Sequence, residues 1–264
     1  MSFWSASFAS SIVQVRTQRW LEVRQVIGQV LFQQGQRSQP ARSGMRLQSV
    51  GDGIVTGSRS QSVLAADDGI GFIDVAEDTL VRVQQLQRLP DGGHVTRLFV
   101  ERGQVSLRIR RFTHRSSELE IQTPAGWSGV RGTEFGLTVQ PDGKTGVATR
   151  SGAVVARAQG RSVSLRGGFQ SLIIPGEPPT PPRPLTTDAR LQLNYLAAVD
   201  RQTARIEGQI DPVNLLLIAD VPQVVDRDGR FQVTVAMLPN RRISAVVITP
   251  LGNRQSYELA VPAL

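Results

Sequence analysis

The residues best placed to do chemistry in this chain are cationic side chains crowded into one short segment. Residues 106–115 read SLRIRRFTHR, and five of them carry potentially cationic groups, namely Arg108, Arg110, Arg111, His114 and Arg115. If Leu107 and Ile109 point into a core, as alternation along a strand predicts, the first two arginines stand on the outer face and the others follow at a turn. Such a cluster attracts an acidic protein, an acidic polysaccharide or a phosphate-bearing headgroup. A solvated strand face without a partner is the alternative interpretation.

A second motif gathers glycine, arginine and glutamate between aromatic residues. Residues 125–139 read AGWSGVRGTEFGLTV, with a core of Gly129, Arg131, Gly132, Glu134 and Phe135. Glycine adopts backbone conformations closed to other residues and lets strands approach closely, so the spacing favours a structural role. We expect Arg131 to point inward as a clamp on several carbonyl groups, with Trp127 and Phe135 buried beside it. The functional alternative is a recognition site or an acid–base pair at Arg131 and Glu134.

Other kinds of chemistry find little support in the sequence. The chain has no cysteine, and its only histidines are His94 and His114, which argues against thiol nucleophiles and histidine-rich metal sites. No Gly-x-Ser-x-Gly motif surrounds a serine, and no glycine-rich phosphate loop precedes a helix. We therefore predict no catalytic residue, no cofactor and no metal site. Nucleic-acid binding is disfavoured, because no aromatic residues alternate with the arginines.

The positive charge is confined to one part of the chain. The net charge is +8, and all but one of the 30 basic residues are arginine, the exception being Lys144. Residues 1–174 carry 21 basic and 13 acidic side chains, whereas residues 185–264 carry 8 of each. The whole excess, 21 − 13 = 8, therefore lies in the first part. We expect that part to meet an acidic partner.

Hydrophobic periodicity predicts an all-β protein. Short alternating runs broken by Gly and Asp-Gly turns fill residues 21–173, which favours a solenoid-like stack of short strands. Residues 174–185 contain six prolines and read as an extended linker, with an ordered surface loop as the alternative. Residues 186–264 predict a short helix at about 186–199 and then a small Ig-like β-sandwich of about seven strands.

Nothing in the sequence predicts a segment that crosses a bilayer. The longest apolar run, residues 213–221, is too short and is interrupted by Asn214 and Asp220. The N-terminal segment, residues 1–20, lacks the basic start and long apolar stretch of a signal peptide.

Several motifs together resemble the FecR domain family over about residues 21–160. They are VGDGIVTG at 50–57, ERGQVSLRI at 101–109, IQTPAGWSGVRGTEFGLTV at 121–139 and RSGAVVARA at 150–158. The resemblance implies an extracytoplasmic β domain that works in cell-envelope signalling and protein contact without catalysis, and hence a periplasmic or extracellular location. The C-terminal part is similar to the small Ig-like domains of bacterial envelope proteins.

These observations favour a non-catalytic binding module of the cell envelope that engages a protein or an acidic glycan. The first alternative is a regulator of sigma-factor-type transmembrane signalling that lacks its cytoplasmic part, which predicts one specific protein partner. The second alternative is an envelope hydrolase, which predicts His94 or His114 beside a serine and a carboxylate in a concave pocket. This is the least favoured of the three.

Overall fold

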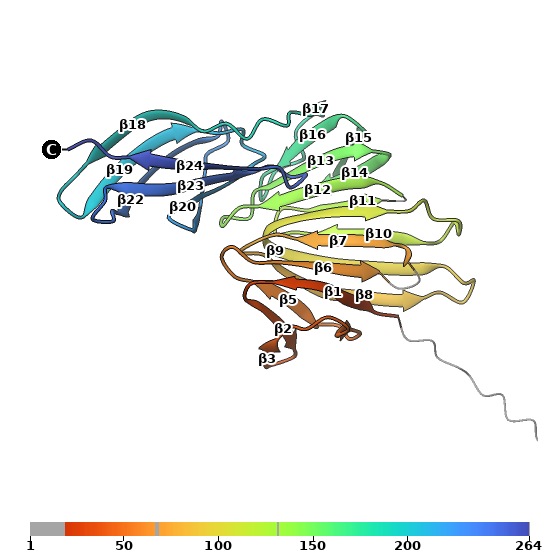
Figure 1. Ribbon diagram of the computed structural model, residues 1–264. Helices are drawn as coiled ribbons and strands as arrows, with labels where there is room; N and C mark the ends of the chain where they lie inside the picture. The colour runs from red at the N-terminus through yellow and green to blue at the C-terminus, as the bar shows by residue number, and fades with distance from the viewer. Residues whose placement is uncertain (1–18, 67–68, 131, 264) are drawn as a thin grey trace, which may run out of the picture.

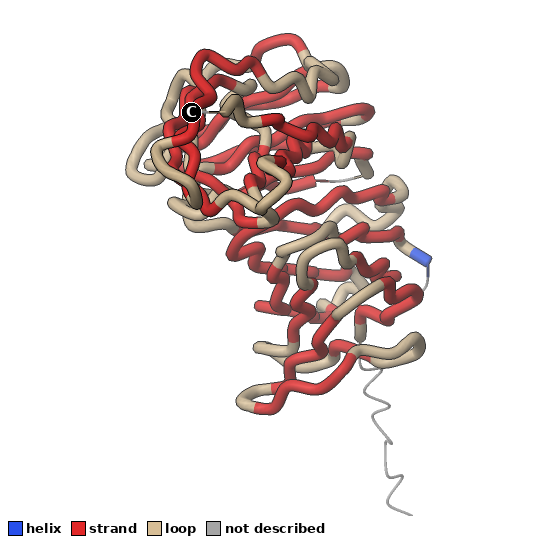
Figure 2. The backbone as a smooth tube through the Cα atoms, turned by 60° about the vertical axis from the view of Figure 1, so that its left-hand side comes forward, coloured by secondary structure: helices blue, strands red, loops and turns tan. Residues whose placement is uncertain are grey.

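Strands dominate the computed structural model, which describes residues 19–66, 69–130 and 132–263. These residues contain no α-helix, and Figure 2 shows strands through both ends of the molecule. The all-β prediction is confirmed. Over the same residues, no helical segment is long and apolar enough to cross a membrane. The predicted N-terminal segment, residues 1–20, lies outside the described residues except for its last two.

The N-terminal stack, residues 21–184, consists of two layers that share one long strand, β9 (His94–Ile109), and that do not close into a barrel. In spatial order, sheet A contains β4 (Arg46–Leu47), β1 (Leu21–Ile27), β6 (Gln61–Ala66), β7 (Gly71–Val75), the second half of β9, β12 (Glu134–Val139), β13 (Thr145–Ser151), β16 (Phe169–Ile173) and β17 (Arg183–Pro184). Sheet B contains β3 (Arg37–Pro40), β2 (Val30–Gln34), β5 (Gly53–Thr56), β8 (Leu80–Arg88), the first half of β9, β10 (Glu118–Gln122), β11 (Trp127–Val130), β14 (Ala153–Ala158) and β15 (Arg161–Arg166).

Strand β9 changes layer at Gly103, and this position requires glycine. Its φ is +96°, and an added Cβ would lie 2.1 Å from the Thr79 hydroxyl. That hydroxyl accepts a hydrogen bond from the Gln104 backbone N–H at 3.0 Å, so the turn is also held by a buried side chain. A single strand can therefore serve both sheets, and alternate residues on either side of the corner, such as Leu98 and Leu107, reach the shared core.

The C-terminal sandwich follows in two smaller sheets (Figure 1). Sheet C contains β18 (Gln192–Ala198), β19 (Thr203–Gln209) and β22 (Arg230–Ala236), and sheet D contains β21 (Val221–Gln223), β20 (Leu215–Ile218), β23 (Arg242–Ile248) and β24 (Arg254–Ala260). Apolar residues of both sheets form its core, including Ile206, Leu216 and Val247.

The helix predicted at about residues 186–199 is wrong, because β18 occupies this position. The pairing of β18 with β19 shifts register between Leu193 and Tyr195, as a β-bulge does. The extra residue interrupts the two-residue alternation, so Leu193 and Leu196 fall at a spacing that resembles one helical turn. The hydrogen bonds to β19 decide the conformation instead.

The proline-rich segment is not a free spacer. Thr180 binds the β16 residue Leu172 twice, since its N–H donates to the Leu172 carbonyl and its hydroxyl accepts from the Leu172 N–H, both at 2.9 Å. Strand β17 then pairs with β16 at Phe169 and Gln170. Prolines lack an N–H and suit a sheet edge, whereas the residues between them supply the bonds. The ordered-loop alternative describes this segment better than the extended linker.

The C-terminal sandwich packs directly on the outer face of sheet A. An added Cβ at Gly136 would lie 1.9 Å from the Pro250 carbonyl oxygen, and one at Gly146 would lie 2.1 Å from that of Val213. The Gln140 amide spans the junction, because it donates to the carbonyls of Pro212 at 3.0 Å and Asn214 at 3.2 Å. The outer face of sheet D is buried beside these contacts, at Leu215, Leu217, Val246 and Ile248. The two parts therefore join in a close, interlocking contact.

Candidate functional site

The predicted cationic segment lies where β9 ends and the loop to β10 begins. Leu107 and Ile109 are buried in the core, whereas Arg108 and Arg110 are exposed, so the expected alternation is confirmed. Arg108 forms an ion pair of 3.3 Å with Asp74 on the outer face of sheet A. The other predicted cations belong to the arginine loop, defined as residues 110–117.

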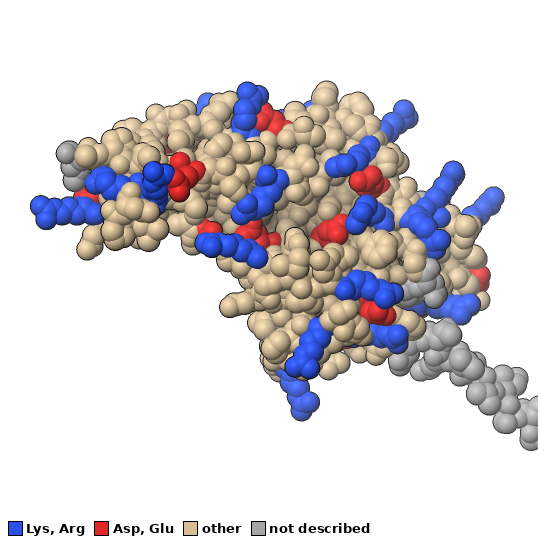
Figure 3. All heavy atoms as spheres, in the orientation of Figure 1, with Lys and Arg blue, Asp and Glu red and all other residues tan. Residues whose placement is uncertain are grey.

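The arginine loop is anchored at both ends and exposed between them. Phe112 packs against the main core, and buried Ser117 accepts a hydrogen bond from the His94 N–H at 3.1 Å. Arg111 and Arg115 are exposed, and they line a hollow of about 550 Å³ together with His114. Figure 3 shows Lys and Arg side chains projecting from the edge of the stack away from the C-terminal sandwich, with few Asp and Glu beside them.

The glycine-rich motif supports this loop. Gly132 has a φ of +109°, and an added Cβ would lie 2.3 Å from the Cα of Arg111. The next residue, Thr133, exchanges backbone hydrogen bonds with Ile109 at 3.0 and 3.1 Å. Close backbone approach explains this glycine, and only a residue without a side chain allows the loop to sit against the motif.

The remaining motif residues divide between core and surface. Phe135 is fully buried, as expected, but Trp127 is 38% exposed, so the expectation that both aromatic residues are buried is wrong for Trp127. Trp127 falls on the outer face of sheet B because β11 alternates, with Ser128 and Val130 inward. Glu134 forms a 3.3 Å ion pair with Arg150. Arg131, the predicted clamp, lies outside the described residues.

His114 lies beside a serine and a carboxylate, but in an order that does not activate a nucleophile. The Ser116 hydroxyl is 2.8 Å from His114 Nδ1 and donates to Asp91 at 3.0 Å. In a catalytic triad the histidine stands between serine and carboxylate, whereas here the serine stands between the other two. Asp91 also accepts the Gly93 N–H, and these bonds hold the pKa of Asp91 below its ordinary value. The group stabilises a turn.

Within the described ranges, no group of three or more His, Asp or Glu side chains is placed to hold a metal ion.

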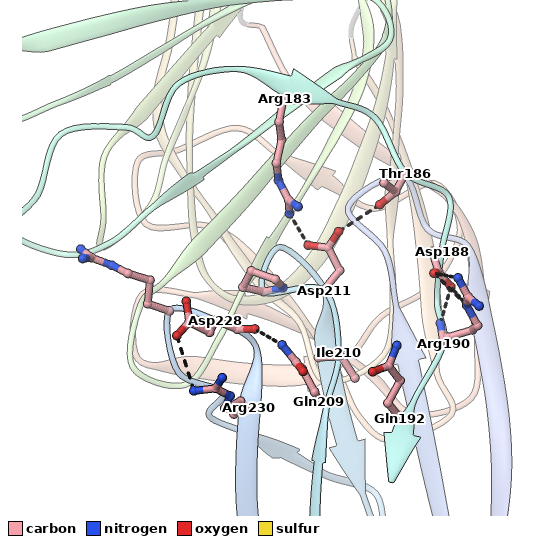
Figure 4. Close-up of a pocket in the computed structure, with 12 residues that line it drawn as sticks. Arg183, Thr186, Asp188, Arg190, Gln192, Gln209, Ile210, Asp211, Asp228 and Arg230 are labelled. Carbon is pink, nitrogen blue, oxygen red and sulfur yellow. Dashed lines mark hydrogen bonds and ion pairs between the residues drawn. The ribbon is translucent and has the colours of Figure 1, made fainter. Parts of the chain in front are cut away.

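A hollow of about 720 Å³ lies at the junction of the two parts (Figure 4). Its arginines are matched by carboxylates: Arg183 pairs with Asp211, and Arg190 pairs with Asp188 at 2.7 Å. Asp211 also accepts the Thr186 hydroxyl at 3.0 Å. The bonds to Asp211 tie the proline-rich segment to the sandwich. The sequence pattern did not reveal them, because Arg183 and Asp211 lie 28 residues apart along the chain.

A match to a protein-family model agrees with the motif analysis. The family model described as FecR protein matches residues 52–155. Two crystal structures of a proposed anti-sigma factor from Parabacteroides distasonis are similar at 15% identity and a TM-score of 0.43, over 52% of this chain and 61% of that one. A polysaccharide lyase is similar at 9% identity and a TM-score of 0.22, over 93% of this chain and 40% of that one. The chain thus covers less than two thirds of either protein, and the comparison with curated proteins gives no match.

The matched range includes the buried anchors of the fold. Asp52 accepts the backbone N–H groups of Gln48 and Ser49 at 2.8 and 2.9 Å. The Thr56 hydroxyl accepts from the Thr79 N–H at 2.9 Å. The chain therefore contains a FecR domain, whose matched part runs from residue 52 to residue 155.

Proposed function

We propose that this chain is the extracytoplasmic part of a non-catalytic signalling regulator that acts by binding a protein through the arginine loop. The FecR domain supports the signalling class. The observation that carries the proposal is the close contact of Gly132 with Arg111. Through this contact, the glycine-rich motif holds the arginine loop in position at the surface. The exposed guanidinium groups would attract an acidic patch on the partner and speed its association.

The proposal places the chain in the periplasm or outside the cell, and the matched FecR domain supports a cell-envelope location. In this proposal the partner is a membrane-bound signalling protein.

The C-terminal sandwich serves in this proposal as an Ig-like second module. When its strands are numbered 1 to 7 from β18 to β24, their spatial order is 1-2-5 in sheet C and 4-3-6-7 in sheet D. This order supports an Ig-like topology. Because the sandwich packs on sheet A, it would hold the FecR domain as one rigid body and offer a second contact away from the arginine loop. The partner would then meet a preorganised surface, which lowers the entropic cost of binding.

In-cell crosslinking tests the proposal. The double variant Arg110→Ser/Arg111→Ser removes charge from the loop, and the matched control Arg37→Ser/Arg42→Ser removes the same charge from an exposed region elsewhere. We expect the parent and the control to recover one dominant protein species and the loop variant to lose it. Recovery of the same species by all three chains would contradict the proposal.

A further inference from the structure

One glycine of the motif has no structural explanation. Added Cβ atoms at Gly126, Gly132 and Gly136 would collide with backbone atoms at 2.4, 2.3 and 1.9 Å. At Gly129 the nearest described atoms belong to Glu120 and lie 3.9 Å away, which is ordinary contact, and the backbone does not require glycine. Glycine within a strand weakens it and often marks a place where a ligand approaches closely.

Gly129 forms the floor of a groove on the outer face of sheet B. The groove has a volume of about 460 Å³, within the range of small-ligand sites. Glu120 on β10 and Val155 on β14 are the register partners of Gly129, so they stand about 5 Å away on either side. Trp127, two residues along the same strand, forms an end wall and exposes part of its indole ring.

The groove combines this aromatic wall with charged groups of both signs. Arg97 binds Glu118 at 2.9 Å and Glu120 at 2.7 Å, which leaves the remaining carboxylate lone pairs free to accept further hydrogen bonds. Arg157 is the register partner of Trp127, and Arg115 lines the groove as well. Within the described residues, no carboxylate lies within ion-pairing distance of Arg115 or Arg157.

We propose that this groove binds an acid-bearing sugar ring of a glycan. One face of a sugar ring carries C–H groups and packs on the Trp127 indole. Its hydroxyl groups donate to Glu118 and Glu120, and its carboxylate accepts a charge-assisted hydrogen bond from Arg157. The groove adjoins the arginine loop, because Arg115 lines both. The sugar proposal rests on Trp127, Gly129 and Arg157 and does not depend on the protein contact proposed for that loop.

The carboxylates of Glu118 and Glu120 favour a sugar over an apolar side chain of a protein partner as the ligand of this groove. An apolar side chain over Gly129 would take the carboxylates of Glu118 and Glu120 out of water without replacing their hydrogen bonds, at considerable cost. A sugar ring fills the same depression and replaces those bonds with its hydroxyl groups. Phe99 stands on the same face, two strands from Trp127 and therefore about 10 Å away, so a longer glycan meets a second aromatic ring.

Titration of the full chain with a galacturonic acid hexamer tests this inference, with a neutral glucose hexamer of the same length as the comparison. Gly129→Val fills the groove, and Ser164→Val places the same side chain on β15 beyond it. Trp127→Ala removes the aromatic wall, and Phe169→Ala removes an equally exposed ring from sheet A, since both are 38% exposed. Calorimetry gives the affinities, and thermal unfolding confirms that each variant is folded.

We expect Gly129→Val and Trp127→Ala to weaken binding of the acidic hexamer about tenfold or more, with little change in the two controls. The neutral hexamer should bind more weakly to the parent. Failure of the parent to bind the acidic hexamer, or unchanged binding by Gly129→Val, would overturn the inference. If the parent binds no sugar but crosslinks to a protein that Gly129→Val does not recover, the groove binds a protein and the inference is wrong. The Arg110→Ser/Arg111→Ser variant should retain sugar binding, so the two proposals can fail separately.

Discussion

The two outer faces of the N-terminal stack carry different residues and meet different surroundings. On sheet A, Gly136 and Gly146 lie under the C-terminal sandwich, with buried Thr138 donating to the Val213 carbonyl between them. On sheet B, Trp127 and Arg157 stand uncovered. Small side chains let a second backbone approach, whereas aromatic and charged groups remain where a soluble ligand reaches them. The difference indicates that one face holds the molecule together and the other is free to bind.

The largest effect should come from blocking the covered face. Gly136→Val places a branched side chain against the Pro250 carbonyl, where even a Cβ would lie at 1.9 Å. We expect a loss of about 3 kcal/mol in unfolding free energy, measured by chemical denaturation. The matched change on the open face, Gly129→Val, should cost much less. Equal losses of unfolding free energy in the two variants would contradict the view that only the outer face of sheet A is covered.

The second-largest loss of stability should come from removing the buried Gln140 amide at the junction. Gln140→Ala leaves the carbonyls of Pro212 and Asn214 without their donor and the Val225 N–H without its acceptor. We expect a destabilisation of about 2 kcal/mol. Gln122→Ala, on the half-exposed face of sheet B, is the control and should change stability by only a few tenths of a kcal/mol. A similarly large loss of stability in Gln122→Ala would contradict the view that the outer face of sheet B is uncovered.

The charged network on sheet B should contribute little to stability. Arg97 is about one-third exposed. Its hydrogen bond to Glu120, and then its pairing with Glu118, raise the pKa of the guanidinium. Because solvent screens such pairs, Arg97→Gln should cost less than about 1 kcal/mol and less still at high salt. A larger loss that persists in salt would make the network structural instead of available to a ligand.

The smallest effect concerns a carboxyl group near the junction. Burial, with Glu77 and Asp220 nearby, raises the pKa of Asp78 above its ordinary value of 3.8, and Oδ2 of Asp78 has no hydrogen-bond partner among the described residues. A raised folded-state pKa gives stability that is present below the unfolded-state pKa and is lost as the pH rises through the folded value. Asp78→Asn should therefore raise the melting temperature by about 1–2 °C at pH 7 and leave it unchanged near pH 3. A gain that is the same at both pH values would contradict this cause.

Much of the N-terminal stack was predictable because its signals are local. Alternation placed Leu107 and Ile109 inward, and the glycines at 126, 132 and 136 marked positions where another backbone segment approaches closely. The partner of each approach was not predictable. Gly136 meets Pro250, and no local pattern connects residues so far apart in the sequence.

The sequence was misleading where tertiary contacts override local pattern. A bulge in β18 imitated helical spacing, and Thr180 tied down a proline-rich segment that composition alone marks as extended. The exposure of Trp127 was missed as well, although the alternation of Trp127, Ser128, Gly129 and Val130 along one strand was available as a signal.

The central claim is that the C-terminal sandwich is fixed on sheet A, so that the faces of the FecR domain have separate roles. Because the chain has no cysteine, Ser162→Cys/Gln255→Cys can be spin-labelled at two exposed sites only, one in each part. Double electron–electron resonance should give a single narrow distance distribution between the labels. A broad distribution, as two modules on a flexible spacer would produce, would contradict the account.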